Sequence, residues 1–241
     1  MTNLNQNGRS MIEMLGVLAI IGVLSVGGIA GYSKAMMKFK TNKTIDQIAM
    51  TVTNIRTLYA QQKDYDITTS QAYKMGVVDD AIVLFEKKGG SGTDKDNLVD
   101  KGKLTNAFSG WAEIAPAKSG VQGETTGAFV VTFGGLPREA CVAIATNDWG
   151  SGYSSGLLGI GTGAAADATT HVIGDIPCDV NGASVASPTG VKDGETNVTY
   201  TALTKYSCAV GKVSAAFSVA DAATGCNCTG TNSCYVTLKY Y

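Results

Sequence analysis

The first quarter of the chain carries two successive hydrophobic patterns, and both indicate helix. Residues 11–30 form a long apolar run in which Glu13 is the only charged residue. At about 1.5 Å per helical residue, this segment is long enough to cross the roughly 30 Å hydrocarbon core of a bilayer. It is therefore predicted to be a membrane-spanning helix.

Beyond this segment, apolar residues recur every three or four positions. The stripe consists of Ile45, Ile48, Val52, Ile55 and Tyr59. One such face is typical of an amphipathic helix that packs on a core. The polar residues expected to face elsewhere are Thr44, Gln47, Asn54 and Gln61. The two patterns together predict one helix from about Met11 to Gln62, roughly 75–80 Å long.

The rest of the chain contains strand and turn signals. Residues 127–133 predict a buried strand, Gly134-Gly135 a turn, and residues 138–145 a helix with Pro137 in its first turn. Residues 196–206 and 235–241 predict further strands, separated by glycine-rich connections. This order favours an α+β head in which an antiparallel sheet packs on the long helix.

The composition suits one globular domain with an anchor, since 44% of the residues are hydrophobic and 30 are glycine. Charged residues make up 16%, below the roughly 25% typical of soluble domains, as in many exported proteins. A formal net charge of −1 gives no electrostatic reason to expect nucleic acid as a partner.

The chain has six cysteines, all after residue 140: Cys141, Cys178, Cys208, Cys226, Cys228 and Cys234. An even number confined to the polar C-terminal part indicates disulfides formed in an oxidising compartment. A metal site built from Cys226, Cys228 and Cys234 is the alternative. Their spacing is not a standard zinc pattern and the chain has one histidine, so disulfides are favoured and no metal is predicted.

Two features of the sequence give conflicting indications of how the segment is oriented in the membrane. Arg9 precedes the segment, whereas Lys34, Lys38, Lys40 and Lys43 follow it, which would place the C-terminal part in the cytoplasm. The cysteines indicate the opposite, and we follow them. Residues 1–8 lack the basic start of a secretory signal peptide, so the apolar segment is expected to be retained.

Motifs for catalysis or ligand binding are weak in this chain. Residues 152–156 match G-x-S-x-G around Ser154, with His171 as the candidate base, but their context is a flexible loop without the required strand and helix. The glycine-rich residues 159–163 lack the Lys-Ser/Thr ending of a phosphate loop. The polar residues 94–100 lack the EF-hand pattern for calcium. We therefore expect no enzyme, no catalytic residue and no cofactor.

The N-terminus carries a recognisable combination of residues. A short polar leader ends in Gly8, and Glu13 follows five residues later, just inside the apolar segment. This layout resembles the class III signal of type IV pilins and of type II secretion pseudopilins. The strand, Leu-Pro turn and cysteine-bearing helix at residues 127–145 resemble the head of type IVb pilins, as does the loop at residues 106–111. The implied fold is the type IV pilin fold.

The resemblance also implies roles for individual residues. A prepilin peptidase would cleave after Gly8 and the new amine of Arg9 would be methylated, although the first mature residue of the family is usually Phe or Met. Glu13 matches the family's carboxylate at the fifth mature position and is expected to act in assembly. For the disulfides, the resemblance implies a bridge from Cys141 to Cys226 or Cys228. Cys178 would then pair with Cys208, which leaves Cys234 for the remaining partner.

The expected organisation has three parts. Residues 1–8 form the leader, residues 9–62 the helix (with a transmembrane and assembly part at 11–30 and an amphipathic spine at 31–62), and residues 63–241 the head. The expected protein is the structural subunit of an extracellular type IV pilus, held in the inner membrane by a single span before assembly. Its partners would be other copies, the peptidase, the membrane and the assembly platform.

Two alternatives to this function remain open. The chain could be a minor pilin or a type II secretion pseudopilin, or a membrane-anchored binding module that never polymerises. Glu13 distinguishes the last of these, because a lone anchor has no use for an acid inside a membrane segment, where ionisable groups are costly and usually functional.

Overall fold

The computed structural model describes residues 11–87, 98–150, 155–180, 187–188, 191–193, 196–209, 217–230 and 232–241. The chain divides into two compact units, residues 1–40 and residues 41–241. The second unit, called the head here, contains the sheet. The end of the long helix therefore belongs to the head, whereas the sequence interpretation began the head at residue 63.

The long helix α1 runs from Met11 to Leu58. It ends four residues before the predicted end at Gln62, so that boundary was wrong. The chain turns directly after Leu58, and the Gln62 backbone N–H donates to the Tyr59 carbonyl at 2.9 Å. The buried Tyr59 donates its hydroxyl to the Asp66 carbonyl at 3.1 Å. A side-chain anchor at Tyr59 thus ends the helix, which no helix-stop residue in the sequence indicates.

The predicted apolar stripe of α1 is confirmed in the part that belongs to the head. Ile48, Val52, Ile55 and Tyr59 are buried and Ile45 is partly buried. The placement of Thr44 was wrong, because its side chain is fully buried. Threonine is small and half apolar, so it fits where a helix lies close to a sheet. The buried face of α1 is therefore wider than the apolar stripe.

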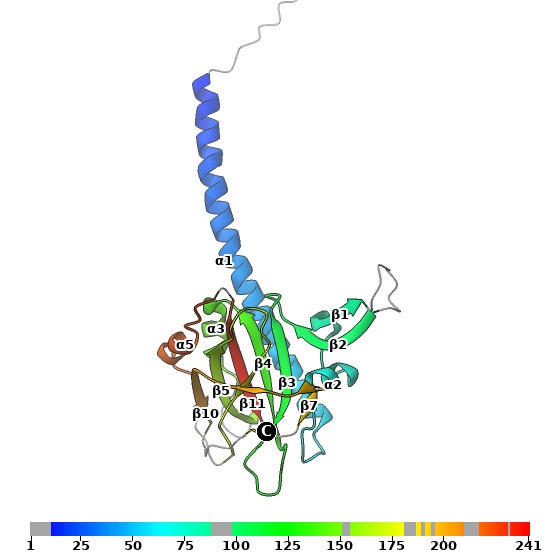
Figure 1. Ribbon diagram of the computed structural model, residues 1–241. Helices are drawn as coiled ribbons and strands as arrows, with labels where there is room; N and C mark the ends of the chain where they lie inside the picture. The colour runs from blue at the N-terminus through cyan, green and yellow to red at the C-terminus, as the bar shows by residue number, and fades with distance from the viewer. Residues whose placement is uncertain are drawn as a thin grey trace, which may run out of the picture. The chain divides into compact units, whose positions relative to one another are not determined.

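The head contains a seven-stranded sheet in the order β1-β2-β3-β4-β11-β5-β10, with every neighbouring pair antiparallel. The strands are β1 Val83–Lys87, β2 Leu98–Thr105, β3 Trp111–Ala117, β4 Ala128–Leu136, β5 Leu157–Ala164, β10 Lys205–Cys208 and β11 Cys234–Tyr240. The last strand, β11, lies between β4 and β5, near the middle of the sheet (Figure 1). This arrangement confirms the predicted α+β head with an antiparallel sheet.

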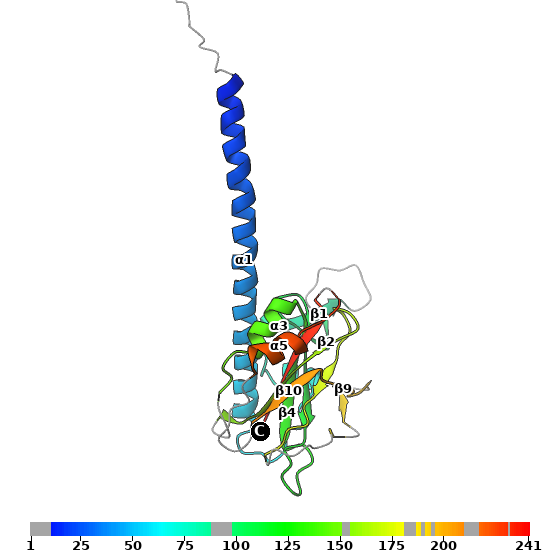
Figure 2. The ribbon, with the colours of Figure 1, turned by 90° about the vertical axis from the view of Figure 1, so that its left-hand side faces the viewer.

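One face of the sheet forms the main core with α1 and α3 (Arg138–Ala145). Alternate residues of a strand share a face. Phe129, Val131 and Phe133 of β4 point to this core, together with Val236 and Leu238 of β11. Figure 2 shows the end of α1 running along this side of the strands. The helix over 138–145 is confirmed, with Pro137 as its N-cap.

The other face of the sheet is covered by a long excursion of the chain between β5 and β10. The described residues 165–180 and 196–204 of this excursion, called the cover here, contain β6 (Ile173–Asp175) and β9 (Tyr200–Ala202), which pair in parallel. The cover packs Ile173, Ile176 and Cys178 onto the sheet. The small pair β7 (Lys192–Asp193) and β8 (Thr196–Asn197) lies between β6 and β9 in the chain.

Two strand predictions need correction. The strand predicted over 196–206 is divided into β8, β9 and β10, because the chain passes there from the cover back to the edge of the sheet. The turn predicted at Gly134-Gly135 lies inside β4, which continues to Leu136. Gly135 has a φ of +69°, where the pairing of β4 with β11 shifts register. A glycine in this left-handed conformation bends the strand without ending it.

Three short elements complete the described head. They are α2 (Thr69–Lys74), the 3₁₀ turn η1 (Asp80–Ile82) and α5 (Val219–Gly225). Helix α2 begins with a capping box, in which Thr68 and Gln71 bond to each other's backbone. Ser218 is the N-cap of α5, and its hydroxyl accepts from the Asp221 backbone N–H at 3.0 Å.

Candidate functional site

The predicted membrane segment is the largest exposed apolar surface among the described residues. All its large apolar side chains are exposed, from 48% at Met14 to 83% at Met11. In the part of the chain that the structure describes, α1 is the one helix that is long and apolar enough to cross a membrane. Contiguous exposed apolar surface of this size marks contact with a membrane or with other protein.

Glu13 lies in the first turn of α1 and is exposed. A carboxylate at this end of a helix interacts favourably with the helix dipole, so part of its role is local. Gly8 and Arg9, the residues predicted for cleavage and methylation, lie outside the described residues. Of the three residues predicted to act in processing and assembly, the structure therefore describes Glu13 alone, at the start of the exposed segment.

All six cysteines form disulfides. The pairs are Cys141–Cys226, Cys178–Cys208 and Cys228–Cys234. The first pair is one of the two that the pilin resemblance implied for Cys141, and the second is the pair implied for Cys178. Since Cys226 pairs with Cys141 and Cys228 with Cys234, none of the three is available as a thiolate for the alternative metal site.

Each disulfide connects different parts of the head. Cys141 in α3 and Cys226 directly after α5 join two helical segments beside the main core, across 85 residues of chain. The Cys178–Cys208 bond joins the cover to the edge strand β10. The third bond closes a short loop at the start of β11. The first two disulfides therefore fasten segments outside the sheet's hydrogen-bonded centre, whereas the third fastens a loop to the inner strand β11.

The glycine-rich residues 159–163 belong to β5, an inner strand of the sheet that the sequence analysis did not predict. Gly159, Gly161 and Gly163 alternate along the strand and therefore share one face. An added Cβ on these glycines would lie 2.7 Å from Cys178 Sγ, 2.3 Å from Leu203 Cδ1 and 2.3 Å from the Tyr235 hydroxyl. The glycines provide a flat backbone surface on which the neighbouring side chains pack.

Replacing Gly163 with alanine is expected to destabilise the head by about 1–3 kcal/mol, the usual cost of overpacking a core. The buried Tyr235 ring cannot move away, because its hydroxyl donates to the Ala202 carbonyl at 3.1 Å. Urea unfolding followed by circular dichroism measures the change. Ala164→Val, at the next and exposed position of β5, is the control and should change stability by less than about 0.5 kcal/mol. Equal effects of the two changes would contradict the packing role of Gly163.

Lys239 of β11 anchors the cover to the sheet. The sequence analysis did not identify this residue. Its side chain is 2% exposed, and its ammonium donates to the carbonyls of Ile176 at 3.1 Å and Cys178 at 2.6 Å. Burial lowers the pKa of Lys239 to about 8, against the opposing effect of Asp175 and Asp179. A lysine within a short, otherwise hydrophobic strand is the one sequence signal that could have indicated a buried polar contact.

His171 is held in the cover by polar contacts to the sheet. Its Nδ1 lies 2.6 Å from Oε1 of Glu113 in β3, and the other carboxylate oxygen of Glu113 accepts from the Thr69 hydroxyl. The imidazole stacks on the Trp111 ring, with centroids 5.3 Å apart. Since Ser154 lies outside the described residues, the structure places His171 in an anchoring contact and does not describe the candidate nucleophile.

The stability of the head is expected to change with alkaline pH in two opposite steps. Between pH 8 and pH 10.5 the unfolded chain holds the Lys239 proton more tightly than the folded one, so stability rises with pH. Burial raises the pKa of Tyr235 to about 12, and burial also raises the pKa of Tyr200 and Tyr240. Above pH 10 unfolding therefore releases tyrosine protons, and stability falls as the pH rises.

Urea unfolding of the full chain across this pH range tests both steps. Lys239→Met should remove the rise, and Tyr235→Phe should reduce the fall. The slope of stability against pH is the readout, because both substitutions also change the stability at neutral pH. If both variants kept the wild-type slopes, the assignment of the rise to Lys239 and of the fall to the buried tyrosines would be wrong.

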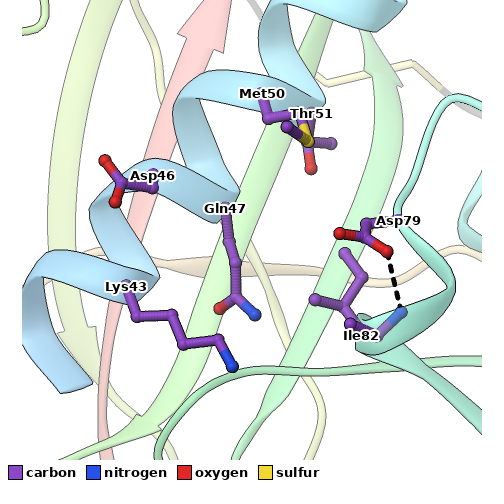
Figure 3. Close-up of a pocket in the computed structure, with 8 residues that line it drawn as sticks. Lys43, Asp46, Gln47, Met50, Thr51, Asp79 and Ile82 are labelled. Carbon is purple, nitrogen blue, oxygen red and sulfur yellow. Dashed lines mark hydrogen bonds between the residues drawn. The ribbon is translucent and has the colours of Figure 1, made fainter.

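A small pocket of about 170 Å³ lies in the head between α1 and η1. Figure 3 shows Lys43 and Gln47 extending from α1 toward Asp79 and Ile82. One Asp79 oxygen accepts from the Ala81 backbone N–H at 3.0 Å and so stabilises the turn. The volume lies below the roughly 300–1,000 Å³ typical of small-molecule sites, so we do not assign the pocket a ligand.

The family model described as PilS N terminal matches residues 38–189, more than half of the chain. The chain therefore belongs to this family, and its identification as a type IVb pilin is confirmed.

Two relatives are each described as "Major structural subunit of bundle-forming pilus". The one from Escherichia coli O127:H6 (strain E2348/69 / EPEC) is 26% identical over 159 residues, which cover 64% of this chain and 72% of the relative. The one from Escherichia coli O111:H- is 26% identical over 148 residues, which cover 61% and 67%.

Two solved structures are also similar. The type IVb pilin from Salmonella typhi is 17% identical, with a TM-score of 0.43 and coverage of 83% of this chain and 97% of that chain. TcpA, a type IV pilin from Vibrio cholerae El Tor biotype, is 13% identical, with a TM-score of 0.44 and coverage of 84% and 99%.

Proposed function

We propose that this chain is the structural subunit of a type IV pilus and that it polymerises through the apolar part of α1. The observation that carries the proposal is the fully exposed apolar segment at residues 11–30, on a chain of the PilS N-terminal family. The curated relatives, which are described as major structural subunits of a pilus, support the same role.

The subunit is proposed to pass through two stages, first in the membrane and then in the fibre. Residues 1–8 are removed by a prepilin peptidase, and the mature chain keeps α1, whose last part belongs to the head, and the rest of the head to residue 241. The subunit first spans the inner membrane once, because an apolar segment of this length is stable in lipid. An assembly platform then transfers it into an extracellular fibre of identical subunits, where the segment packs against its counterparts. The amine of Arg9 is the proposed site of methylation.

Two measurements on the native organism test this proposal. Electron microscopy of sheared surface material should show fibres, and mass spectrometry of those fibres should give a chain that begins at Arg9. Replacing Gly8 with a bulky residue should leave the leader attached. Sheared fibres that lack this chain, or an N-terminus at another residue, would contradict the proposal.

The abundance of the chain in the fibres separates the main proposal from its nearest alternative. A major subunit accounts for most of the protein in the fibre, whereas a minor pilin is present in small amounts and a pseudopilin forms no long surface fibre under ordinary expression. Quantitative mass spectrometry of the sheared material therefore distinguishes them.

A further inference from the structure

Glu13, near the start of the apolar segment, and Lys34, after its end, lie about one bilayer thickness apart. Glu13 and Lys34 have no charged residue between them, and both belong to the helix α1. Their 21-residue separation corresponds to about 31 Å along a helix, and the hydrocarbon core of a bilayer is roughly 30 Å thick. With Glu13 at one boundary of the core, Lys34 lies at the other.

Three side chains in this part of α1 suit the headgroup layer. Lys38 follows Lys34 by one turn, about 6 Å further along the same face of the helix, and both side chains are exposed. The headgroup layer is roughly 5–8 Å thick on each side of a bilayer, so both ammonium groups reach it. Tyr32, which is 66% exposed, is of a residue type that concentrates at membrane–water boundaries.

The charge in this region is of one sign. No acidic residue occurs between Glu13 and Asp46, whereas the same stretch contains Lys34, Lys38, Lys40 and Lys43. Lysines usually concentrate on the cytoplasmic side of a span, yet the disulfides of the head require an oxidising compartment. The positive charge therefore lies on the unfavoured side of the membrane, where a negatively charged membrane surface would stabilise it.

We propose that Tyr32, Lys34 and Lys38 form a binding site for the headgroups of anionic phospholipids, in the leaflet at the C-terminal end of the apolar segment. The lysines pair with the lipid phosphates and Tyr32 lies at the edge of the hydrocarbon core. The site would retain the unassembled subunit at a defined depth. This retention rests on the proposed function, because it concerns the stage before the fibre forms.

The preference for anionic lipid can be measured on the full chain in vesicles that contain both phosphatidylcholine and phosphatidylglycerol. Spin-labelled forms of the two lipids report, by electron paramagnetic resonance, which lipid contacts the protein. We expect preferential contact with phosphatidylglycerol that weakens at high salt. Lys34→Gln with Lys38→Gln should reduce the preference by about fivefold for each lysine removed. Lys34→Arg with Lys38→Arg should preserve it.

The controls separate this site from general surface charge. Lys63→Gln with Lys74→Gln removes two exposed lysines of the head and should preserve the lipid preference. Inorganic phosphate added to the mixed vesicles should not displace the labelled phosphatidylglycerol, because the helix requires a phosphate held at the membrane surface. Full preference in the Lys34 and Lys38 double glutamine variant, or an equal loss in the control variant, would overturn the proposal.

Fibre formation in the same variants provides an independent measurement. Loss of fibres with an unchanged lipid preference would mean that these lysines bind a neighbouring subunit, and it would also overturn the lipid site. A wild-type chain that prefers phosphatidylglycerol but never enters fibres would contradict the proposed pilus role and leave the lipid site standing.

Discussion

Replacing Glu13 with alanine is expected to leave leader removal intact and to abolish or severely reduce fibre assembly. After the proposed cleavage, Arg9 carries a free amine and Glu13 lies four positions further along. In a fibre both groups leave water, and an unpaired buried charge costs several kcal/mol, which an opposite charge offsets in large part. The carboxylate of one subunit facing the amine of the next would therefore determine the axial position at which a subunit is added.

The measurement compares surface fibres by electron microscopy with the mass of the processed chain in the membrane. Asp46→Ala is the matched control, because it removes an exposed acid from α1 outside the apolar segment and should give normal fibres. The alternative is that the Glu13 side chain merely extends to the headgroup layer beside its own amine. Normal amounts of fibre from Glu13→Ala would favour this alternative and exclude the pairing.

Removal of the Cys141–Cys226 disulfide is expected to cause the largest loss of stability in the head, about 4–5 kcal/mol. In the chain-entropy model the stabilisation grows with the length of the closed loop, and 85 residues separate these two cysteines. Both side chains are fully buried beside the main core, so their replacement by alanine also removes packing contacts. A loss of this size is comparable to the total stability of many domains.

The Cys228–Cys234 pair provides the matched control, because it closes a loop across only six residues. The same model gives about 2–3 kcal/mol for a loop of this length. Thermal unfolding of the full chain in detergent, with each pair replaced by alanine, compares the two losses. A smaller loss for the Cys141–Cys226 variant than for the Cys228–Cys234 variant would show that loop length does not determine how much each disulfide stabilises the head.

The sequence alone determined the elements that depend on local pattern. The apolar run at residues 11–30 and the stripe from Ile45 to Tyr59 specify α1, because helical periodicity is a property of neighbouring residues. The buried run of β4 and the helix after Pro137 follow from the same kind of signal. Glu13 was identified because a charge within an apolar run is visible without a structure.

Strand β5 was missed for a physical reason. Its alternating glycines carry no side chain that could indicate a strand, and glycine ordinarily weakens strands. Only in the folded head does their lack of side chains become an advantage, since Leu203 and Tyr235 need the space. The same reasoning applies to Gly134, whose missing side chain admits the Trp111 ring.

The tertiary structure alone decided which distant residues meet. Lys239 and the carbonyl of Cys178 are 61 positions apart, and Glu113 and His171 are 58 apart, so no local pattern relates them. Their contacts arise because the cover folds back over the second face of the sheet. The exposure of residues 11–30, by contrast, was determined by the sequence itself, because a helix that is apolar on every side cannot bury its whole surface against one small head.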